Sequence, residues 1–261
     1  MRLLKRGGRI LQKEGVADFI RRSLSYLKHE LEVVYYGTVA ERNAPITYHG
    51  VEIPVDMDVF TDRIRHAFSS GSYEKEEVAL INDYVTEPYD IVDLGASTGF
   101  TTTYTLKRLD DTVSAVAVEA NPAMVDVLHE VKKRNGVEYR IENSAYDPTE
   151  AEVEFYIHNK TVSSSTKRDD GEKITVSGIN VERIVDEYDL DEFICLVDIE
   201  GGEIDLVANE LHVLEDRCRL IIIEIHDIDE IASETKRALD DSAFELVDST
   251  NDVYVYMNDP E

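Results

Sequence analysis

Residues 90–102, DIVDLGASTGFTT, join an acidic residue at the end of an apolar run to a glycine-rich turn. Asp93 closes the run, and Gly95, Ala96 and Gly99 follow it. A glycine-rich turn after a buried strand lets the backbone approach a nucleotide, and the helix that follows presents unpaired N–H groups to it. We therefore expect a nucleotide-bearing cofactor here, in contact with these four residues.

Polar residues that follow the next strands extend this candidate cofactor site. Glu119 ends the apolar run VSAVAV at 113–118, where its carboxylate is placed to accept hydrogen bonds from two ribose hydroxyls. Asn121 shapes the start of the following helix, and Asn143 and Ser144 follow the third strand. Because the carboxyl ends of parallel strands meet at one edge of a sheet, we expect these four polar residues beside the cofactor.

Two later apolar runs end in groups that can move a proton. LVDIEGGE contains Asp198 and Glu200, and IIIEIH contains Glu224 and His226. Imidazole titrates near neutral pH, so His226 is chemically the better general base, and Asp198 is the alternative. In a second mechanism, Asp198 and Glu224 hold Mg²⁺, which lowers the pKa of an acceptor hydroxyl. Both mechanisms fit the residues, and we assign no side chain to a permanent metal site.

Two further segments are candidates for holding an acceptor. Tyr73 and Glu74 stand at the start of a helix predicted over 74–86 and are placed to form a lid over the crevice. The polar stretch TVSSSTKRDDGEK at 161–173 is a candidate acceptor loop. Such loops frequently carry binding residues because a rigid scaffold positions them.

The elements that must position these residues alternate between strands and helices from residue 90 onward. Helical segments separate buried strands predicted at 91–94, 113–118, 137–141, 193–198 and 220–225. This alternation is typical of a parallel sheet with helices on both faces. The end of the chain, FELVDSTNDVYVYMN, predicts two strands around an Asn251-Asp252 turn. We therefore expect an α/β fold with a doubly wound, mostly parallel, Rossmann-like sheet of about seven strands, the last one antiparallel.

Three regions of different character are predicted along the chain. Residues 1–36 form a basic amphipathic helical extension, with apolar residues at helical spacing from Val16 to Val34. Residues 37–88 form a cap or lid region, in which TYHGVEIPVD predicts a hairpin. Residues 89–261 form the catalytic domain that binds the cofactor.

The charge is strongly acidic and unevenly distributed. The chain of 261 residues carries a net charge of −28, whereas residues 1–30 carry eight bases and three acids. Such a surface repels phosphate, which argues against nucleic acid as a partner. It suits a cytoplasm with molar salt, as in a halophilic archaeon. The basic helix can lie on an anionic membrane surface or dock on the acidic body, and both alternatives stay open.

Cysteine and hydropathy patterns favour a protein inside the cell. Cys195 and Cys218 belong to no metal-binding spacing and predict no structural disulfide. No run reaches the roughly 18 apolar residues that a membrane span needs, and no signal-peptide pattern follows the basic start. We expect a cytoplasmic protein, with peripheral contact to the inner face of the membrane through residues 1–36 as a hypothesis.

Two cofactors compete for the DLGASTG turn. A dinucleotide presents a pyrophosphate that the carboxylate of Asp93 would repel, whereas S-adenosylmethionine presents a positive sulfonium and an ammonium group that acids attract. The acids of VDIEGGE favour S-adenosylmethionine for the same reason. Tyr156 and Lys160 match a Tyr-x-x-x-Lys pattern of short-chain dehydrogenases, but the alternation of 151–158 predicts a strand, which separates the two side chains.

The order of these motifs resembles the FkbM family of S-adenosylmethionine-dependent methyltransferases. The resemblance covers about residues 70–226 and rests on DLGASTG, VEANP, ENSAY, LVDIEGGE and IIIEIH, of which the D-x-E-G-x-E element is the most specific. Ser97-Thr98 departs from relatives, which often have Asn and Ile there. The family implies a class I methyltransferase fold and O-methylation, commonly of sugar hydroxyls in glycans, lipids or natural products.

We therefore expect an enzyme that moves a methyl group from S-adenosylmethionine to an oxygen of a sugar. A hexuronic acid or hexose of a lipid-linked cell-surface glycan is our hypothesis for the acceptor. The alternatives are an NAD-dependent oxidoreductase of Rossmann type and a non-catalytic binding protein that keeps the methyltransferase fold. The residues do not decide the oligomeric state or the position methylated.

Overall fold

The centre of the molecule is a seven-stranded sheet in the order β11-β12-β10-β9-β3-β4-β5. The computed structural model describes residues 16–109, 112–157, 172–226 and 231–258. Neighbouring strands are parallel from β5 to β10, and β12 is antiparallel to both β10 and β11. The predicted mostly parallel, doubly wound sheet is therefore confirmed. Its strands are β3 (Asp90–Leu94), β4 (Ala115–Val118), β5 (Arg140–Glu142), β9 (Phe193–Val197), β10 (Cys218–Glu224), β11 (Glu245–Thr250) and β12 (Val253–Met257).

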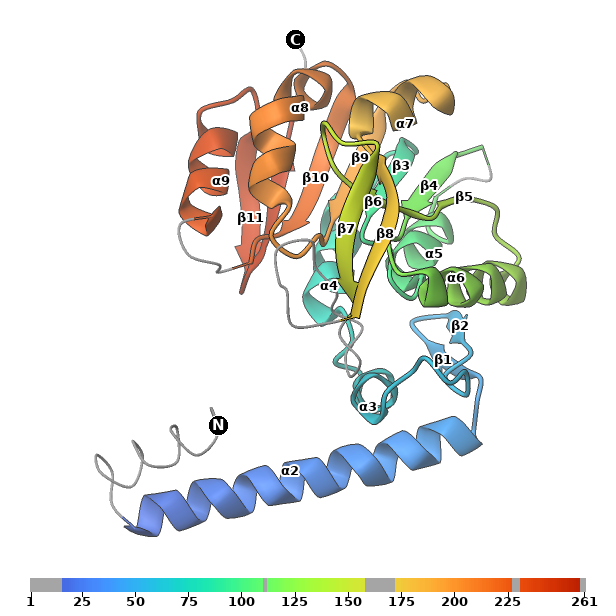
Figure 1. Cartoon of the computed structure of the whole chain (residues 1–261), viewed down its shortest axis with the longest axis vertical. Coiled ribbons are helices and arrows are strands. Elements are labelled where there is room, and N and C mark those ends of the chain that lie inside the picture. Colours follow the sequence, from blue (N-terminus) through green and yellow to red (C-terminus); the bar gives the residue numbers. More distant parts are fainter. Residues whose placement is uncertain (1–15, 110–111, 158–171, 227–230, 259–261) are drawn as a thin grey trace.

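Helices cover both faces of this sheet (Figure 1). One face packs on α4, α5 and α6, and the other packs on α7, α8 and α9. The side chains of each strand alternate between the two cores: Ile91 lies in the first and Val92 in the second, as the two-residue period of a strand requires. These helices are α4 (Lys75–Tyr84), α5 (Phe100–Leu106), α6 (Pro122–Asn135), α7 (Val181–Glu187), α8 (Glu203–Arg217) and α9 (Ile231–Asp240).

Local sequence signals begin and end the helix that follows β4. The side chain of Asn121 accepts a hydrogen bond from the backbone N–H of Ala123, and Pro122 opens α6. Gly136 ends it in the left-handed conformation, with φ of 63°. We predicted Asn121 at the start of this helix, which lies shortly after Glu119.

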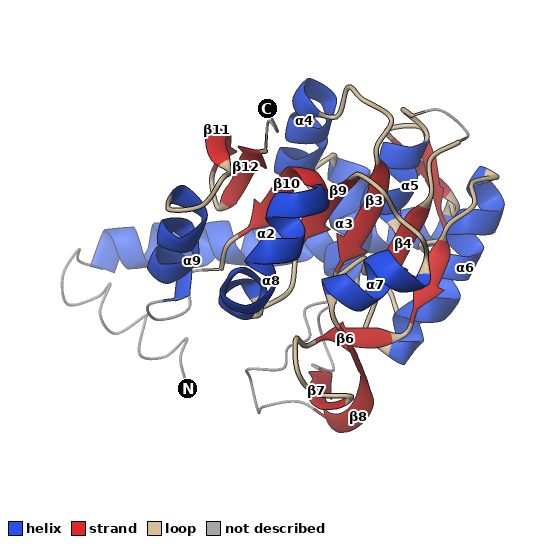
Figure 2. Ribbon diagram, turned by 90° about the horizontal axis from the view of Figure 1, so that it is seen from above, coloured by secondary structure: helices blue, strands red, loops and turns tan. Residues whose placement is uncertain are grey.

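A second, smaller sheet stands beside the carboxyl edge of the main one (Figure 2). Its order is β6-β8-β7, and its strands are β6 (Ser144–Tyr146), β7 (Glu152–Ile157) and β8 (Glu172–Ile179). The sequence predicted a strand at 151–158 but not a separate sheet, because β6 has only three residues and its partner β8 lies far along the chain. Ala145, Val153, Phe155 and Val176 of this sheet form one buried cluster with Ala120, which follows β4.

The N-terminal helix ends later than the sequence predicted. We expected helix up to residue 36, whereas α2 (Val16–Arg42) continues to Arg42 because Val33 and Ala40 are buried against the body. It packs on α3 (Asp62–Ser70), close to a hairpin of β1 (Ile46–Tyr48) and β2 (Val51–Ile53) (Figure 1). No helix in the described part of the chain has the length and apolar character to cross a membrane. The division into three regions stays a prediction.

Candidate active site

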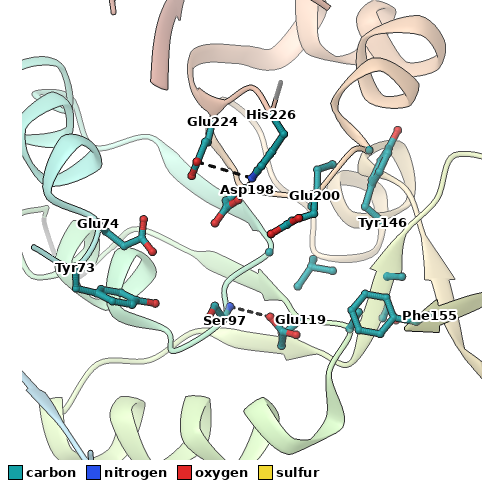
Figure 3. Close-up of a pocket in the computed structure, with 17 residues that line it drawn as sticks. Tyr73, Glu74, Ser97, Glu119, Tyr146, Phe155, Asp198, Glu200, Glu224 and His226 are labelled. Atoms are coloured by element: carbon teal, nitrogen blue, oxygen red, sulfur yellow. Dashed lines mark hydrogen bonds and ion pairs between the residues drawn. The ribbon is translucent and has the colours of Figure 1, made fainter. Parts of the chain in front are cut away.

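A cavity of about 300 Å³ opens at the carboxyl ends of β3, β4, β9 and β10. Five carboxylates and one imidazole line it: Glu74, Glu119, Asp198, Glu200, Glu224 and His226 (Figure 3). A second cavity of about 30 Å³ shares several of these residues and adds Asp93, Ala96 and Glu77. The strand ends thus bring the predicted catalytic residues into one site with part of the predicted cofactor set.

The glycine-rich turn after β3 lies closer to the backbone that follows β9 than a side chain would allow. Gly95 has φ of 90°, and a Cβ atom there would lie 1.9 Å from the carbonyl oxygen of Asp198. The backbone N–H of Asp198 donates to the carbonyl of Leu94 at 2.9 Å, which continues the sheet into the site. Gly99 has a different neighbour, since a Cβ there would lie 2.7 Å from Leu128 Cδ2. Gly99 therefore serves the packing of α5 on α6, and it does not line either cavity.

Asp93 is held below the turn by α5. Its carboxylate accepts hydrogen bonds from the hydroxyls of Thr101 at 3.1 Å and Thr102 at 2.5 Å. Burial raises its pKa to about 6, although the two threonines oppose the shift. It lines only the smaller cavity. The Asp93 carboxylate therefore lies close to any ligand group that binds against the Gly95 turn.

Glu119 is fixed in place by backbone donors from two loops. Its carboxylate accepts from the N–H of Ser97 at 2.8 Å and the N–H of Asn121 at 2.6 Å. Burial raises its pKa to about 7. Asn143 donates to the carbonyl of Glu119 at 2.8 Å, so Asn121 and Asn143 support the loop and do not line the cavity. Ser144 does line it.

His226 lies at the centre of the predicted catalytic group. Its Nε2 is 3.7 Å from Asp198 Oδ1 and 3.8 Å from Glu224 Oε1 (Figure 3). Its Nδ1 is 2.5 Å from Glu203 Oε1. Burial opposes the charged imidazole, but the hydrogen bond to Glu203 and the nearby carboxylates outweigh it and raise the pKa of His226. Burial and Glu224 raise the pKa of Asp198.

Tyr73 and Glu74 lie across the cavity from Glu200, at the start of α4. The hydroxyls of Tyr73 and Thr98 are 3.2 Å apart, which ties this segment to the glycine-rich turn. Glu74 has φ of 42°, and burial and the neighbouring Glu77 raise the pKa of its carboxyl group well above the usual range. Both residues line both cavities, in the place where we predicted a lid.

The sequence interpretation missed several residues of the site. Glu203 was quoted as the last acid of LVDIEGGE but received no role, and its contact with His226 depends on the register of β10 against α8. Phe155 lines the cavity from β7, and only the alternation of AEVEFYIH indicated that strand. The predicted acceptor loop at 161–173 and Lys160 fall outside the described residues, apart from 172–173 in β8.

A comparison with protein families identifies the domain in this chain. The profile of the methyltransferase FkbM domain matches residues 93–257, more than half of the chain. Solved structures of similar fold include a methyltransferase from Pyrococcus furiosus, at 9% identity over 88% of this chain and 98% of that one, with a TM-score of 0.47. Another is the ribosomal protein L11 methylase of Lactobacillus delbrueckii subsp. bulgaricus, at 12% identity over 71% of this chain and 77% of that one, with a TM-score of 0.42. A third is a fibrillarin pre-rRNA processing protein of Methanococcus jannaschii, at 16% identity over 67% of this chain and 70% of that one, with a TM-score of 0.40. No curated protein matches the chain.

The seven-stranded sheet and the matching domain together define a class I methyltransferase that uses S-adenosylmethionine as methyl donor. The chain belongs to the FkbM methyltransferase family.

The contact between the Gly95 turn and Asp198 makes a direct prediction about stability. Gly95→Ala should lower the free energy of unfolding by about 3 kcal/mol, because strain at positive φ adds to a steric clash with the Asp198 carbonyl. Gly136→Ala is the matched control, since φ there is 63° and nothing lies within 4 Å, so about 1 kcal/mol is expected. Urea unfolding measures both variants, and equal losses would contradict the prediction.

Proposed function

We propose that this methyltransferase transfers the methyl group of S-adenosylmethionine to a hydroxyl oxygen of a sugar in a glycan or glycolipid. The observation that carries the proposal is the group of carboxylates around His226, at the strand ends beside the Gly95 turn. Carboxylates accept hydrogen bonds from sugar hydroxyls, and imidazole or carboxylate groups accept the proton that an alcohol must lose. The family membership supports the same reaction.

The cavity suits a cationic cofactor better than a dinucleotide. No lysine or arginine is among the described residues that line the two cavities, whereas carboxylates are frequent. A sulfonium and an ammonium group are attracted by such a lining, and a pyrophosphate is repelled. This electrostatic pattern supports S-adenosylmethionine over NAD.

Each part of the cofactor has a chemically suitable neighbour. Glu119 would hold the ribose hydroxyls, because its carboxylate is already oriented by two backbone donors and lines the cavity. Ser144 and the small-sheet residue Phe155 would border the adenine, with Ala120 beside them. The Gly95 turn, with Asp93 and Ala96 beneath it, would border the methionine part. We propose these residues as the cofactor contacts.

The chain's own groups would align the acceptor and take its proton. The bound cofactor supplies an electrophilic methyl group, and the acceptor oxygen must face it in line with the sulfur. His226 Nε2 and Asp198 Oδ1 lie 3.7 Å apart at this place, and the hydroxyl proton would pass to one of these two groups. Tyr73, Glu74 and Glu200 would hold other hydroxyls of the sugar from the two sides of the cavity.

The negative charge of the site also affects which class of sugar it can accept. Carboxylates at this density favour a neutral hexose over a hexuronic acid, whose own carboxylate they repel. A hexuronic acid would need a cation between itself and Glu224 or Asp198. A divalent cation such as Mg²⁺ at these acids is the second mechanism of activation, because it lowers the pKa of a bound hydroxyl.

The role of Glu119 predicts a pH dependence of cofactor binding. The pKa of Glu119 is raised to about 7, and only the ionised form accepts both ribose hydroxyls. The affinity for S-adenosylhomocysteine should therefore be about tenfold weaker at pH 6 than at pH 8. In Glu119→Gln the affinity should be lower at pH 8, with no such step. Calorimetric titration in about molar KCl measures this, with NAD as the control ligand; binding of NAD instead would overturn the cofactor assignment.

The acceptor class is tested by following the methyl group. The purified full chain is incubated with radioactively methyl-labelled S-adenosylmethionine and, in separate reactions, with glycolipid, free oligosaccharide, protein and RNA fractions. Label should enter the sugar of the glycolipid or oligosaccharide fraction, and His226→Ala should lower the rate by about 10²-fold or more. Label that enters only RNA or protein would contradict a sugar acceptor.

The N-terminal helix supports a lipid-linked acceptor. One face of α2 carries large apolar side chains spaced three or four residues apart, each 51 to 71% exposed: Ile20, Leu24, Leu27, Leu31, Val34 and Tyr35. We call this face the α2 stripe. It points away from the body, because Val33 and Ala40 on the opposite face are buried. An exposed apolar stripe preceded by a basic segment can lie in a membrane interface. We propose that it holds the enzyme at the cytoplasmic face of an anionic membrane.

A single charge on the α2 stripe tests this contact. Leu27→Glu should weaken binding of the full chain to phosphatidylglycerol vesicles by about tenfold or more, because burial of a leucine contributes about 2 kcal/mol. Ser25→Glu adds the same charge at an exposed position off the stripe and should bind as the unaltered chain does. Vesicle sedimentation measures both. The membrane proposal is wrong if the unaltered chain does not sediment with the vesicles. It is also wrong if the chain forms a dimer that Leu27→Glu dissociates.

A further inference from the structure

Three potential metal ligands converge from the ends of two adjacent strands. Asp198 follows β9, and Glu224 and His226 lie at the end of β10. Each offers one ligand atom, and the three atoms lie within 4.8 Å of one another. Figure 3 shows the three side chains turned toward a common point. A small divalent cation at that point would lie about 2.1–2.3 Å from each atom after a shift of a few tenths of an ångström.

The fully buried Glu203 fixes the direction in which His226 can coordinate. Its Oε1 lies 2.5 Å from Nδ1 of His226, so Nδ1–H donates to Glu203 and Nε2 faces the cavity. A carboxylate on the outer nitrogen of a histidine is the arrangement that orients metal-binding imidazoles in proteins. The second oxygen of Glu203 has no hydrogen-bond partner in the described part of the chain, and the whole side chain is buried behind this imidazole.

The distances in front of His226 are too long for direct hydrogen bonds to the two carboxylates. Nε2 is 3.7 Å from Asp198 Oδ1 and 3.8 Å from Glu224 Oε1, and an N–H···O hydrogen bond needs about 3.2 Å or less. A proton on Nε2 would therefore not join the imidazole to either carboxylate. A cation that coordinates all three atoms would join them, because two ligands of one metal ion lie about 3.0–3.4 Å apart.

The surroundings concentrate positive ions at this point. Glu74, Glu77 and Glu224 form a second acidic group within the same distance limit, and Glu224 belongs to both. No lysine or arginine is present among the described lining residues of either cavity, so His226 is the one nitrogen base there that faces these acids. The field of the cavity therefore attracts cations toward Glu224.

We propose that Asp198, Glu224 and His226 bind a divalent metal ion of the Mn²⁺ type, with Glu203 as the positioning residue. One imidazole nitrogen and two carboxylates suit Mn²⁺ better than Mg²⁺, which prefers oxygen ligands and water. The remaining positions on the ion are open to two neighbouring oxygens of the acceptor. Binding of the ion stands on these residues alone, whereas its role as activator of the acceptor hydroxyl rests on the proposed function.

The test measures Mn²⁺ binding without catalysis. The full chain is freed of metal, and the free Mn²⁺ signal is followed by electron paramagnetic resonance during titration in about 1 M KCl, which screens loose binding to the acidic surface. One tight site per chain is expected. His226→Ala and Asp198→Asn should weaken it by at least tenfold, and Glu203→Gln by about 10- to 100-fold. Glu245→Gln removes an exposed acid on the edge strand β11 and should leave the affinity for Mn²⁺ unchanged.

Two outcomes would overturn the proposal. One is the absence of a tight site in a chain that still binds S-adenosylhomocysteine, which leaves the methyltransferase activity intact but without this ion. The other is a site that is lost in Glu77→Gln and unchanged in His226→Ala, which would place the ion in the second acidic group. A chain that binds Mn²⁺ but not S-adenosylhomocysteine would instead contradict the proposed function and leave the metal site standing.

Discussion

The close approach of the Gly95 turn to the backbone of Asp198 is the constraint on which the site depends. A Cβ at position 95 would lie 1.9 Å from the Asp198 carbonyl oxygen, so the loops after β3 and β9 meet only because residue 95 has no side chain. That meeting sets the turn that we propose for the cofactor beside Asp198, the first of the proposed catalytic acids. The neighbouring strands β4 and β10 then add Glu119 on one side and Glu224 on the other, since parallel strands deliver their carboxyl ends to the same edge.

Features with a local signal were predictable from the sequence. The alternation of apolar runs with helical segments gave the parallel sheet, and Asn121, Pro122 and Gly136 marked the ends of α6. Acids at strand ends led to Asp198 and Glu119, because their positions follow from topology alone. Both residues line the main cavity.

Features that depend on long-range packing were not predictable. Glu203 faces His226 only because α8 lies against β10, and nothing in the spacing of the two residues indicates that contact. The small sheet needed the pairing of β6 with β8 across some thirty residues. The C-terminal end of α2 depended on burial of Ala40 against the body, which a helical period by itself does not reveal. Gly99 and Asn121, which we predicted as cofactor residues, line neither cavity; Gly99 allows the close packing of α5 on α6, and Asn121 caps α6.

The acids of the site and the acids of the surface have different physical consequences. Surface carboxylates keep their water, whereas burial raises the pKa of Asp93 to about 6 and that of Glu119 to about 7. The native state therefore binds these protons more tightly than the unfolded chain, and each group makes the fold less stable as pH rises from its ordinary pKa to its raised one. A cation that enters the site offsets this loss of stability, because it favours the ionised carboxylates and releases their protons. The fold thus maintains a cavity that is electrostatically unfavourable when empty, and a positively charged cofactor or metal ion gains affinity from that same unfavourable charge.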